Sequence, residues 1–205
     1  GGEAADIRNQ VQQLTKQGVQ KIVLDLRGVS AGTMDEAVAV ANLFIKDGNL
    51  GQVIGRENKV LKTYSADSTK FLFEGKLAVL IDLGTAGAGE VVASAITERQ
   101  RGEVIGERSF GAGTEQQLFT LRGGDGFLLT TSKWASPSGK AFLGEDRTNS
   151  GVKPSIEVKR AETPDELNPE DLADQNQNEQ SEKPIPNDEK AKPAVEEIHL
   201  KKALE

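Results

Sequence analysis

The chain has 205 residues, one histidine, no cysteine and a formal net charge of −7. The lack of cysteine excludes disulfides, thiolate metal ligands and a cysteine nucleophile, and the position of His199 in a charged tail argues against a Ser-His-Asp triad. The net charge lies in residues 160–205, with 13 acidic and 6 basic side chains, whereas residues 1–159 hold 19 of each. Residues 1–159, which we call the body, are therefore neutral overall and lack the excess of basic side chains that is typical of nucleic-acid-binding domains.

Residues 1–107 predict helices that alternate with strands. Ile7, Val11 and Leu14 recur at helical spacing, and short β-branched runs such as QKIVLDL are typical of buried strands. No run is apolar for long enough to cross a membrane, so we expect a piece of a soluble region. Helices are predicted over residues 3–17, 34–45 and 88–100, and strands over 20–26, 52–56, 59–64, 76–82 and 102–107. This alternation predicts an α/β layer structure with a mostly parallel sheet.

The second half of the chain predicts a β-hairpin, a last strand and a tail. EQQLFTL and GFLLTTSKW flank RGGDG and are expected to pair as the hairpin, and SIEVK, residues 155–159, is a short strand. Residues 160–193 combine acidic side chains with five prolines, which predicts a linker. Residues 194–205 regain helical periodicity. The expected organisation is therefore a domain over 1–159, an acidic linker over 160–193 and a helix over 194–205.

Two glycine-rich turns, GTAGAGE and FGAGTEQ, stand next to strands or helices but hold no evident catalytic group. One interpretation is a dinucleotide-binding unit, because the first turn lies between a predicted strand and a predicted helix. Glu107 follows Gly87 by twenty residues, as the acid that binds the ribose does in such units. The glycines nevertheless run G-x-x-G-x-G here, whereas the dinucleotide-binding motif is G-x-G-x-x-G. Glu90 would also place a negative charge where the pyrophosphate binds. A second interpretation is that the glycines serve only tight turns and close packing.

A third interpretation comes from a family resemblance that runs in order along the body. IVLDLRGVSAGTMDEAVAVANLFIKDG, LAVLIDLGTAGAGEVVASAI, RGEVIGERSFGAGTEQ and LLTTSKWASPSGKAF with GVKPSIEV resemble the successive motifs of the carboxyl-terminal processing (tail-specific) serine peptidases. HLKKALE resembles the terminal helix of that family. The resemblance implies a ClpP/crotonase-like α/β fold, with layered sheet and flanking helices plus the hairpin region. It also implies a preceding PDZ domain, which we do not expect within these 205 residues.

The resemblance also implies a reaction, a substrate class and a location. Family members hydrolyse peptide bonds near protein C-termini with a Ser–Lys dyad, in which the lysine deprotonates the serine and backbone amides stabilise the oxyanion. The expected partners are protein or peptide C-termini, in an extracytoplasmic setting. We expect no cofactor, no metal and no nucleic acid, and oligomers are compatible with the family.

The reactive side chains of the dyad are missing from this sequence. The serine of the family motif falls on Gly87 and the lysine on Ala112, with the family's separation of 25 residues. Gln116 matches the glutamine that orients the lysine. The oxyanion amides fall on Ala88 and on Ala31–Gly32, although the family NPGG has become VSAG here. The resemblance thus predicts a scaffold without its dyad.

Three histories of the site remain open. The chain is a natural pseudopeptidase that binds chain ends, an enzyme inactivated by engineering, or a peptidase whose dyad has moved. For the last, the available groups are Ser94, Ser109, Lys133 and Lys140, and Thr85 is expected instead to cap the following helix.

Four other side chains are expected to have mainly structural roles. Trp134 and Phe142 flank SPSGK, either beside the substrate groove or, as the favoured interpretation, in the core. Glu90 is expected to favour the positive end of its helix. His199 is expected to be a solvated helix residue.

Overall fold

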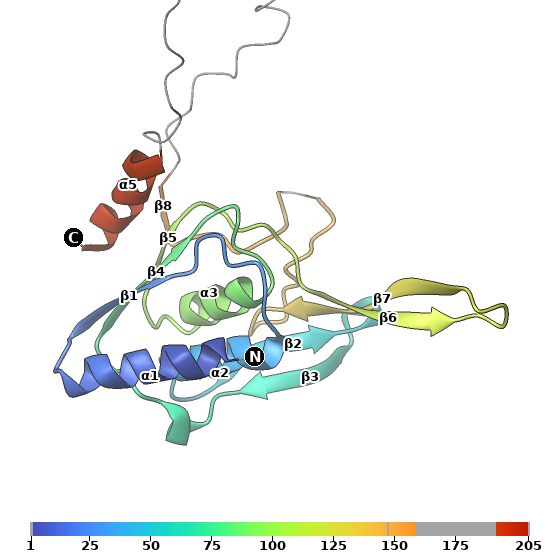
Figure 1. The fold of residues 1–205 in the computed structure, drawn as a ribbon, viewed down its shortest axis with the longest axis horizontal. Helices are drawn as coiled ribbons and strands as arrows, with labels where there is room; N and C mark the ends of the chain where they lie inside the picture. The colour runs from blue at the N-terminus through green and yellow to red at the C-terminus, as the bar shows by residue number, and fades with distance from the viewer. Residues whose placement is uncertain (1, 147, 159–191, 205) are drawn as a thin grey trace, which may run out of the picture.

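The structure, a computed structural model, describes residues 2–146, 148–158 and 192–204 (Figure 1). Two four-stranded sheets are separated by helices. The helices are α1 (Glu3–Lys16), α2 (Met34–Asn42), α3 (Ala88–Glu98) and α5 (Lys192–Leu204), with 3₁₀ turns at Arg56–Asn58 and Ser68–Lys70. The strands are β1 (Lys21–Asp25), β2 (Asn49–Ile54), β3 (Val60–Ser65), β4 (Lys76–Ile81), β5 (Glu103–Gly106), β6 (Thr114–Thr120), β7 (Gly126–Ala135) and β8 (Ile156–Glu157).

The first sheet is parallel, in the order β1-β4-β5-β8. Its strands are short apolar runs, as expected for a parallel sheet whose two faces are both covered. Side chains on one face, including Ile22, Val79 and Val104, join the main hydrophobic core with the helices α1, α2 and α3. α5 contacts β4 and β5 from the other face (Figure 1). The carboxyl ends of β1 and β4 therefore lead into neighbouring loops at one edge of the sheet.

Helix α3 is the central helix of the domain. Each residue from Ala88 to Ile96 is buried, because the helix packs against α2, β2 and β5 at once. Its small residues, among them Gly89 and Ala93, permit this close approach: a Cβ on Gly89 would come within 2.8 Å of the Thr85 methyl group and 3.2 Å of the Val29 carbonyl. Burial on every side is typical of a helix in the interior of a layered fold, and α3 is largely apolar apart from Glu90 and Ser94 over its buried part.

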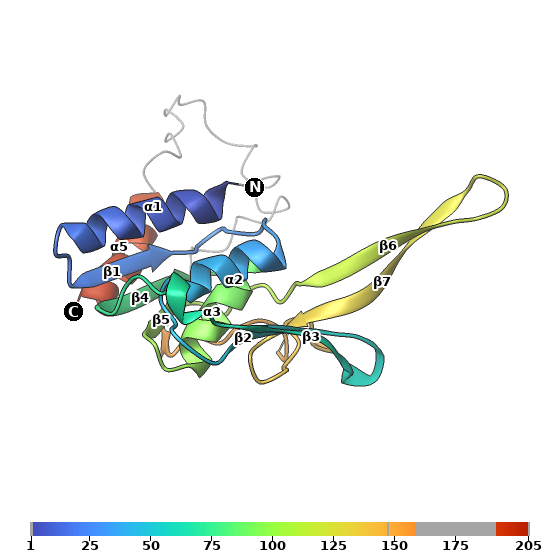
Figure 2. The same cartoon turned by 90° about the horizontal axis from the view of Figure 1, so that it is seen from below.

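The second sheet is antiparallel, in the order β3-β2-β7-β6. The strands expected around 52–56 and 59–64 belong to it, so the expectation of a mostly parallel sheet is wrong: half of the strands are antiparallel. β2 pairs with β7 only over Lys133–Ala135, whereas β6 pairs with β7 along its whole length. The outer part of the hairpin consequently leaves the body as a two-stranded arm (Figure 2).

Helix α5 corrects the prediction for His199. The helix begins at Lys192 rather than at 194, and His199 is only 2% exposed, with Nε2 3.3 Å from the carbonyl oxygen of Val158. The histidine is buried because α5 lies on the sheet, which the helical pattern by itself did not reveal. Residues 160–191 of the expected linker lie outside the described residues. Within the described ranges, every helix is too short or too polar to span a bilayer.

Candidate active site

The first glycine turn joins β4 to α3 and gives Gly87 an unusual backbone conformation. Gly87 is the N-cap residue of α3, with φ 52° and ψ −108°, a region that side-chain-bearing residues adopt only under strain. A Cβ built on Gly87 would meet only the Trp134 ring, at 3.7 Å, so a small side chain fits there. A sharp turn between a strand and a helix, with a strained residue at its apex, is how α/β hydrolases present a nucleophile.

Thr85 supports this turn but does not cap the helix, so the predicted cap is wrong. Its hydroxyl donates to the carbonyl oxygen of Leu26 at 2.8 Å and accepts from the amide of Asp82 at 3.0 Å. The threonine thereby attaches the turn after β4 to the end of β1. Because Thr85 is fully buried, these bonds satisfy polar groups that water cannot reach.

Glu90 connects the two glycine-rich turns. Its Oε2 accepts hydrogen bonds from the amides of Gly87 and Ala112, both at 2.9 Å, and its Oε1 accepts from the amide of Gly111 at 2.7 Å and the hydroxyl of Ser109 at 2.5 Å. The backbone nitrogens at the two expected dyad positions are therefore no more than two hydrogen-bond lengths apart. The structure thus brings the backbone of Gly87 close to that of Ala112.

The carboxyl of Glu90 is fully buried. The sequence analysis predicted neither this burial nor the link between the two turns. Burial raises the pKa of Glu90 above its usual value, and the four hydrogen bonds oppose that shift without cancelling it. Ser109 continues the network, since its Oγ accepts from the amide of Val152 at 2.7 Å. The expected attraction of Glu90 to the helix end holds, because it lies in the first turn, but its main contacts reach 22 residues along the chain.

The expected oxyanion residues lie against one another. A Cβ on Gly32 would be 3.0 Å from the Cβ of Ala88, and Gly32 itself has φ +113°. The amide of Ala86 donates to the carbonyl oxygen of Val29 at 2.8 Å, which holds the 29–32 loop against the turn before α3. Over residues 2–146 and 148–158, no hydrogen bond uses the amide of Ala31, Gly32 or Ala88 as its donor.

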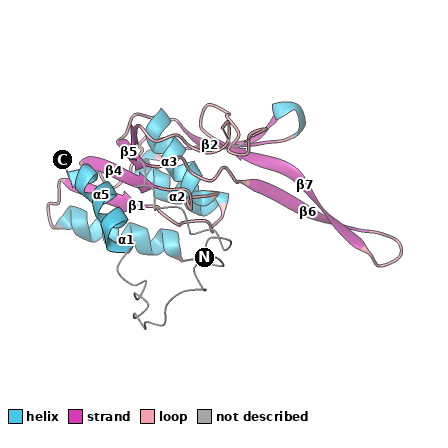
Figure 3. Cartoon of the chain, turned by 90° about the horizontal axis from the view of Figure 1, so that it is seen from above, coloured by secondary structure: helices cyan, strands magenta, loops and turns pink. Residues whose placement is uncertain are grey.

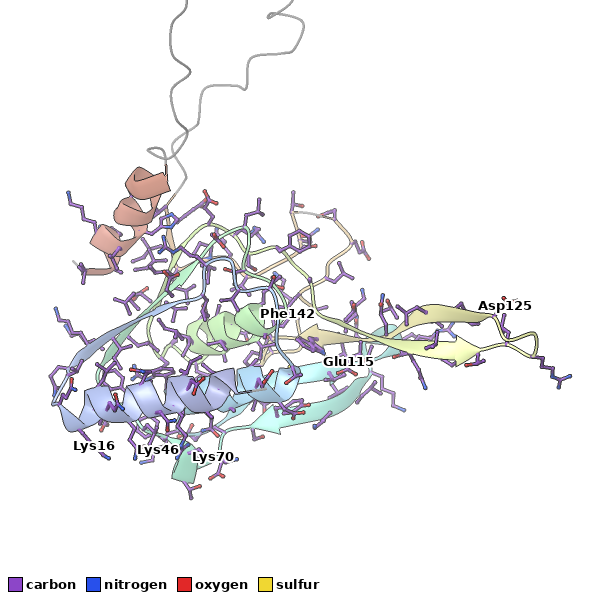
Figure 4. All side chains as sticks on the ribbon, viewed as in Figure 1. Lys16, Lys46, Lys70, Glu115, Asp125 and Phe142 are labelled. Atoms are coloured by element: carbon purple, nitrogen blue, oxygen red, sulfur yellow. The ribbon has the colours of Figure 1, made fainter. Side chains whose placement is uncertain are left out.

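The remaining predicted residues surround this centre in different ways. Gln116 is exposed on β6, four positions beyond Ala112. Phe142 is 2% exposed and belongs to the core, at the base of the arm (Figure 4). Trp134 is half-buried and packs against the core, yet its ring is the closest group to a Cβ on Gly87, and its Nε1 donates to Glu115 at 3.1 Å. Trp134 therefore serves both the core and the site.

The serines proposed as relocated nucleophiles have other partners. Ser94 donates to the carbonyl oxygen of Val91 within α3, and Ser109 donates to Glu90. Lys133 lies 3.4 Å from the carbonyl oxygen of Leu143. Across the described part of the chain, no serine hydroxyl is hydrogen-bonded to a lysine amine, and no group of three or more His, Asp and Glu side chains could hold a metal ion.

Residues 2–158 match Peptidase family S41. The chain belongs to this family. It is 34% identical over 155 residues to the chloroplastic C-terminal processing peptidase of Tetradesmus obliquus, and 31% identical over 157 residues to a probable CtpA-like serine protease of Staphylococcus epidermidis. Each match covers 76% of this chain, and 32% and 31% of the respective relatives. The chain thus spans about a third of the length of these curated relatives.

A solved structure supports the same assignment. The photosystem II D1 C-terminal processing protease is 32% identical, with a TM-score of 0.68, over 76% of this chain and 39% of that protein. Mature CPAF, at 11% identity and a TM-score of 0.60, shares the fold. The expected family and the mixed α/β fold are confirmed. The named relatives are a chloroplast protein and bacterial proteins.

Proposed function

We propose that this S41 domain binds extended polypeptide C-termini and cleaves them poorly or not at all. The observation that carries the proposal is the geometry of Gly87 and Ala112: the strained apex and the Glu90 link between the two positions are present, while both reactive side chains are missing. Loss of one member of such a catalytic unit costs about 10⁶ in rate, and loss of both costs little more. Binding does not depend on these two groups, so it can persist without cleavage.

The roles of the other site residues follow from their atoms. In the family reaction a serine oxygen attacks the peptide carbonyl, a neutral lysine takes its proton, and the carbonyl oxygen becomes an oxyanion. The amides of Ala31, Gly32 and Ala88 can donate to that oxygen or to a terminal carboxylate, and the N-terminus of α3 favours the negative charge. Gln116 would orient the lysine, so its role in this chain would appear only after a lysine is introduced.

The proposed partners are protein or peptide C-termini, in an extracytoplasmic compartment. The support for the partners is the family itself and the names of two relatives, which describe C-terminal processing. The reaction of a Ser–Lys dyad needs no metal and no cofactor. Recognition through backbone hydrogen bonds suits an extended peptide, because such bonds are independent of sequence.

Restoring the dyad tests the proposal. Fluorogenic peptides with a free C-terminal carboxylate are incubated with wild type, Gly87→Ser, Ala112→Lys and the double variant, and binding is followed by fluorescence anisotropy. We expect all four to bind the peptide and only the double variant to hydrolyse it at an appreciable rate. Gly87→Ser should also destabilise the fold by about 1–3 kcal/mol, since serine must adopt the strained φ and ψ of Gly87.

Two outcomes count against the proposal. If wild type cleaves as fast as the double variant, another nucleophile acts, and the alternative of a relocated dyad is correct. If no variant binds the peptide, although circular dichroism shows each to be folded, the VSAG loop at residues 29–32 has closed the groove and the domain is only a scaffold. An amidated peptide is the matched control for recognition of the terminal carboxylate.

A further inference from the structure

The arm, defined as residues 116–132 of β6, its turn and β7, holds six of the 14 exposed large apolar side chains of the described residues. Figure 3 shows it extending from the body on its own. Its exposed fractions are high for apolar side chains: Leu118 65%, Leu128 58%, Leu121 51%, Leu129 49%, Phe127 46% and Phe119 36%. Soluble monomers rarely leave such a contiguous apolar surface in water, so the arm has the character of an interaction site.

Both faces of the arm are apolar. Leu118 and Leu128 are cross-strand partners on one face, and Phe119 and Phe127 are partners on the other, with their rings stacked at 5.5 Å between centroids. A two-stranded hairpin is only marginally stable in water by itself. The arm therefore gains stability from any partner that adds strands or covers its faces.

The outer part of the arm has few of the features that prevent strand pairing, and the register irregularity of the ladder lies at its base, between Glu115 and Gln116. Between Glu115 and Arg122, and between Asp125 and Lys133, the sequence has no charged residue and no proline. Natural sheets protect exposed edges with lysine, proline, bulges or short strands. β6 is the outermost strand of its sheet, and it keeps an unprotected edge from Gln116 to Thr120.

We propose that the arm is a dimerisation element that pairs with the arm of a second copy of this chain. The β6 edges meet antiparallel about a two-fold axis at Leu118, which makes one four-stranded sheet from two arms. The charges favour a second copy in the antiparallel direction, because Glu115 lies near the base of β6 and Arg122 lies beyond its outer end. Antiparallel pairing brings opposite charges near each other at both ends, whereas parallel pairing would bring like charges together.

The register supports the same two-fold axis. With Leu118 opposite its copy, the existing Leu118–Leu128 pair extends into a continuous row of four leucines across the four strands. On the other face, Phe119 stands opposite Gln117 of the second copy. A two-fold interface must be self-complementary, since each contact occurs twice, and this register fulfils that condition without placing two like charges opposite each other.

The shape of the molecule permits this pairing. Glu115 lies at the base of the arm and Asp125 at its tip, and side chains project on both sides between them (Figure 4). In an antiparallel arrangement each tip reaches the base of the other arm, so the two bodies lie at opposite ends of the shared sheet. This inference concerns the arm alone and does not depend on whether the site cleaves peptides.

A single cysteine tests the register directly, because the chain has no cysteine of its own. Cα atoms of opposed residues in antiparallel strands are about 4.5–5.5 Å apart, within the range of about 4.4–6.8 Å that a disulfide needs. Leu118→Cys should therefore form a covalent dimer on mild oxidation. Leu128→Cys is the matched control: it is similarly exposed but lies one strand further out in each copy, about 14 Å from its counterpart, and should remain uncrosslinked.

Charge reversal tests the interface without oxidation. Wild type should be a dimer by analytical ultracentrifugation at micromolar concentration and above, while Leu118→Lys and Leu118→Glu should each be monomeric. An equimolar mixture of these two variants should dimerise again, which a merely structural effect would not produce. Leu204→Lys, at a site that is 66% exposed on α5, should leave the dimer intact. A wild-type monomer, or a Leu118→Lys dimer as stable as the Leu204→Lys dimer, overturns the proposal.

Discussion

Replacing Glu90 by glutamine isolates the contact that holds the two glycine turns together. The side chains have the same shape, so no cavity forms. Glutamine, however, has one oxygen where glutamate has two, and its amide nitrogen must face one pair of the present donors. The least costly orientation places the amide nitrogen beside Ser109, whose hydroxyl can turn to accept, and leaves the amide of Gly111 facing another donor.

The magnitude follows from these atoms. One buried amide without an acceptor costs about 1–3 kcal/mol, and the remaining bonds lose the added strength of a charged acceptor, about 1 kcal/mol each. Relief from burying a charge offsets part of this loss. We therefore expect Glu90→Gln to lower the free energy of unfolding by about 2–4 kcal/mol.

Urea unfolding followed by circular dichroism measures this difference. Glu98→Gln is the matched control, because Glu98 lies on the same helix and accepts from Ser138 at the exposed surface, where water can replace the carboxylate. We expect the control to cost less than about 1 kcal/mol. Equal losses in the two variants would falsify the assignment of Glu90 as the link between the turns.

Three further predictions concern pH, backbone geometry and the terminal helix. Burial raises the pKa of Glu90 in the folded protein, so the folded state binds a proton more readily than the unfolded chain does. The contribution of Glu90 to stability therefore falls as the pH rises from 4.5, the usual pKa, through the raised pKa of the folded state. Urea titrations from pH 4 to 7 should show wild type losing stability relative to Glu90→Gln. Gly106→Ala should destabilise more than Gly28→Ala, because both have positive φ but a Cβ on Gly106 would come to 2.0 Å from a β4 carbonyl, whereas Gly28 has open space; the Gly28 change should cost about 1–2 kcal/mol, and equal urea midpoints would contradict the packing. His199→Ala should lower the thermal midpoint while Leu204→Ala leaves it unchanged, since only the histidine is buried; an unchanged midpoint for both would mean that α5 adds nothing to the body.

The sequence by itself determined the family and most of the elements. Apolar periodicity and glycine positions place each helix and strand to within a few residues, because these signals are local. The ordered motifs also identify Gly87 and Ala112 as the counterparts of the dyad, since a separation of 25 residues can be counted without any structure. The contact between the two glycine turns was implied only through the resemblance.

Tertiary structure alone decided which groups hold the site. The carboxylate of Glu90 accepts from backbone N–H groups. Every residue except proline has such a group, so the pattern of side chains in the sequence cannot predict which ones Glu90 binds. The separation of the strands into a parallel and an antiparallel sheet depends on pairings between distant segments, which local periodicity does not specify. His199 is buried only because α5 lies on β4 and β5. The strained conformation of Gly87 likewise results from the junction of β4 and α3, since glycine by itself tolerates many backbone angles and selects none.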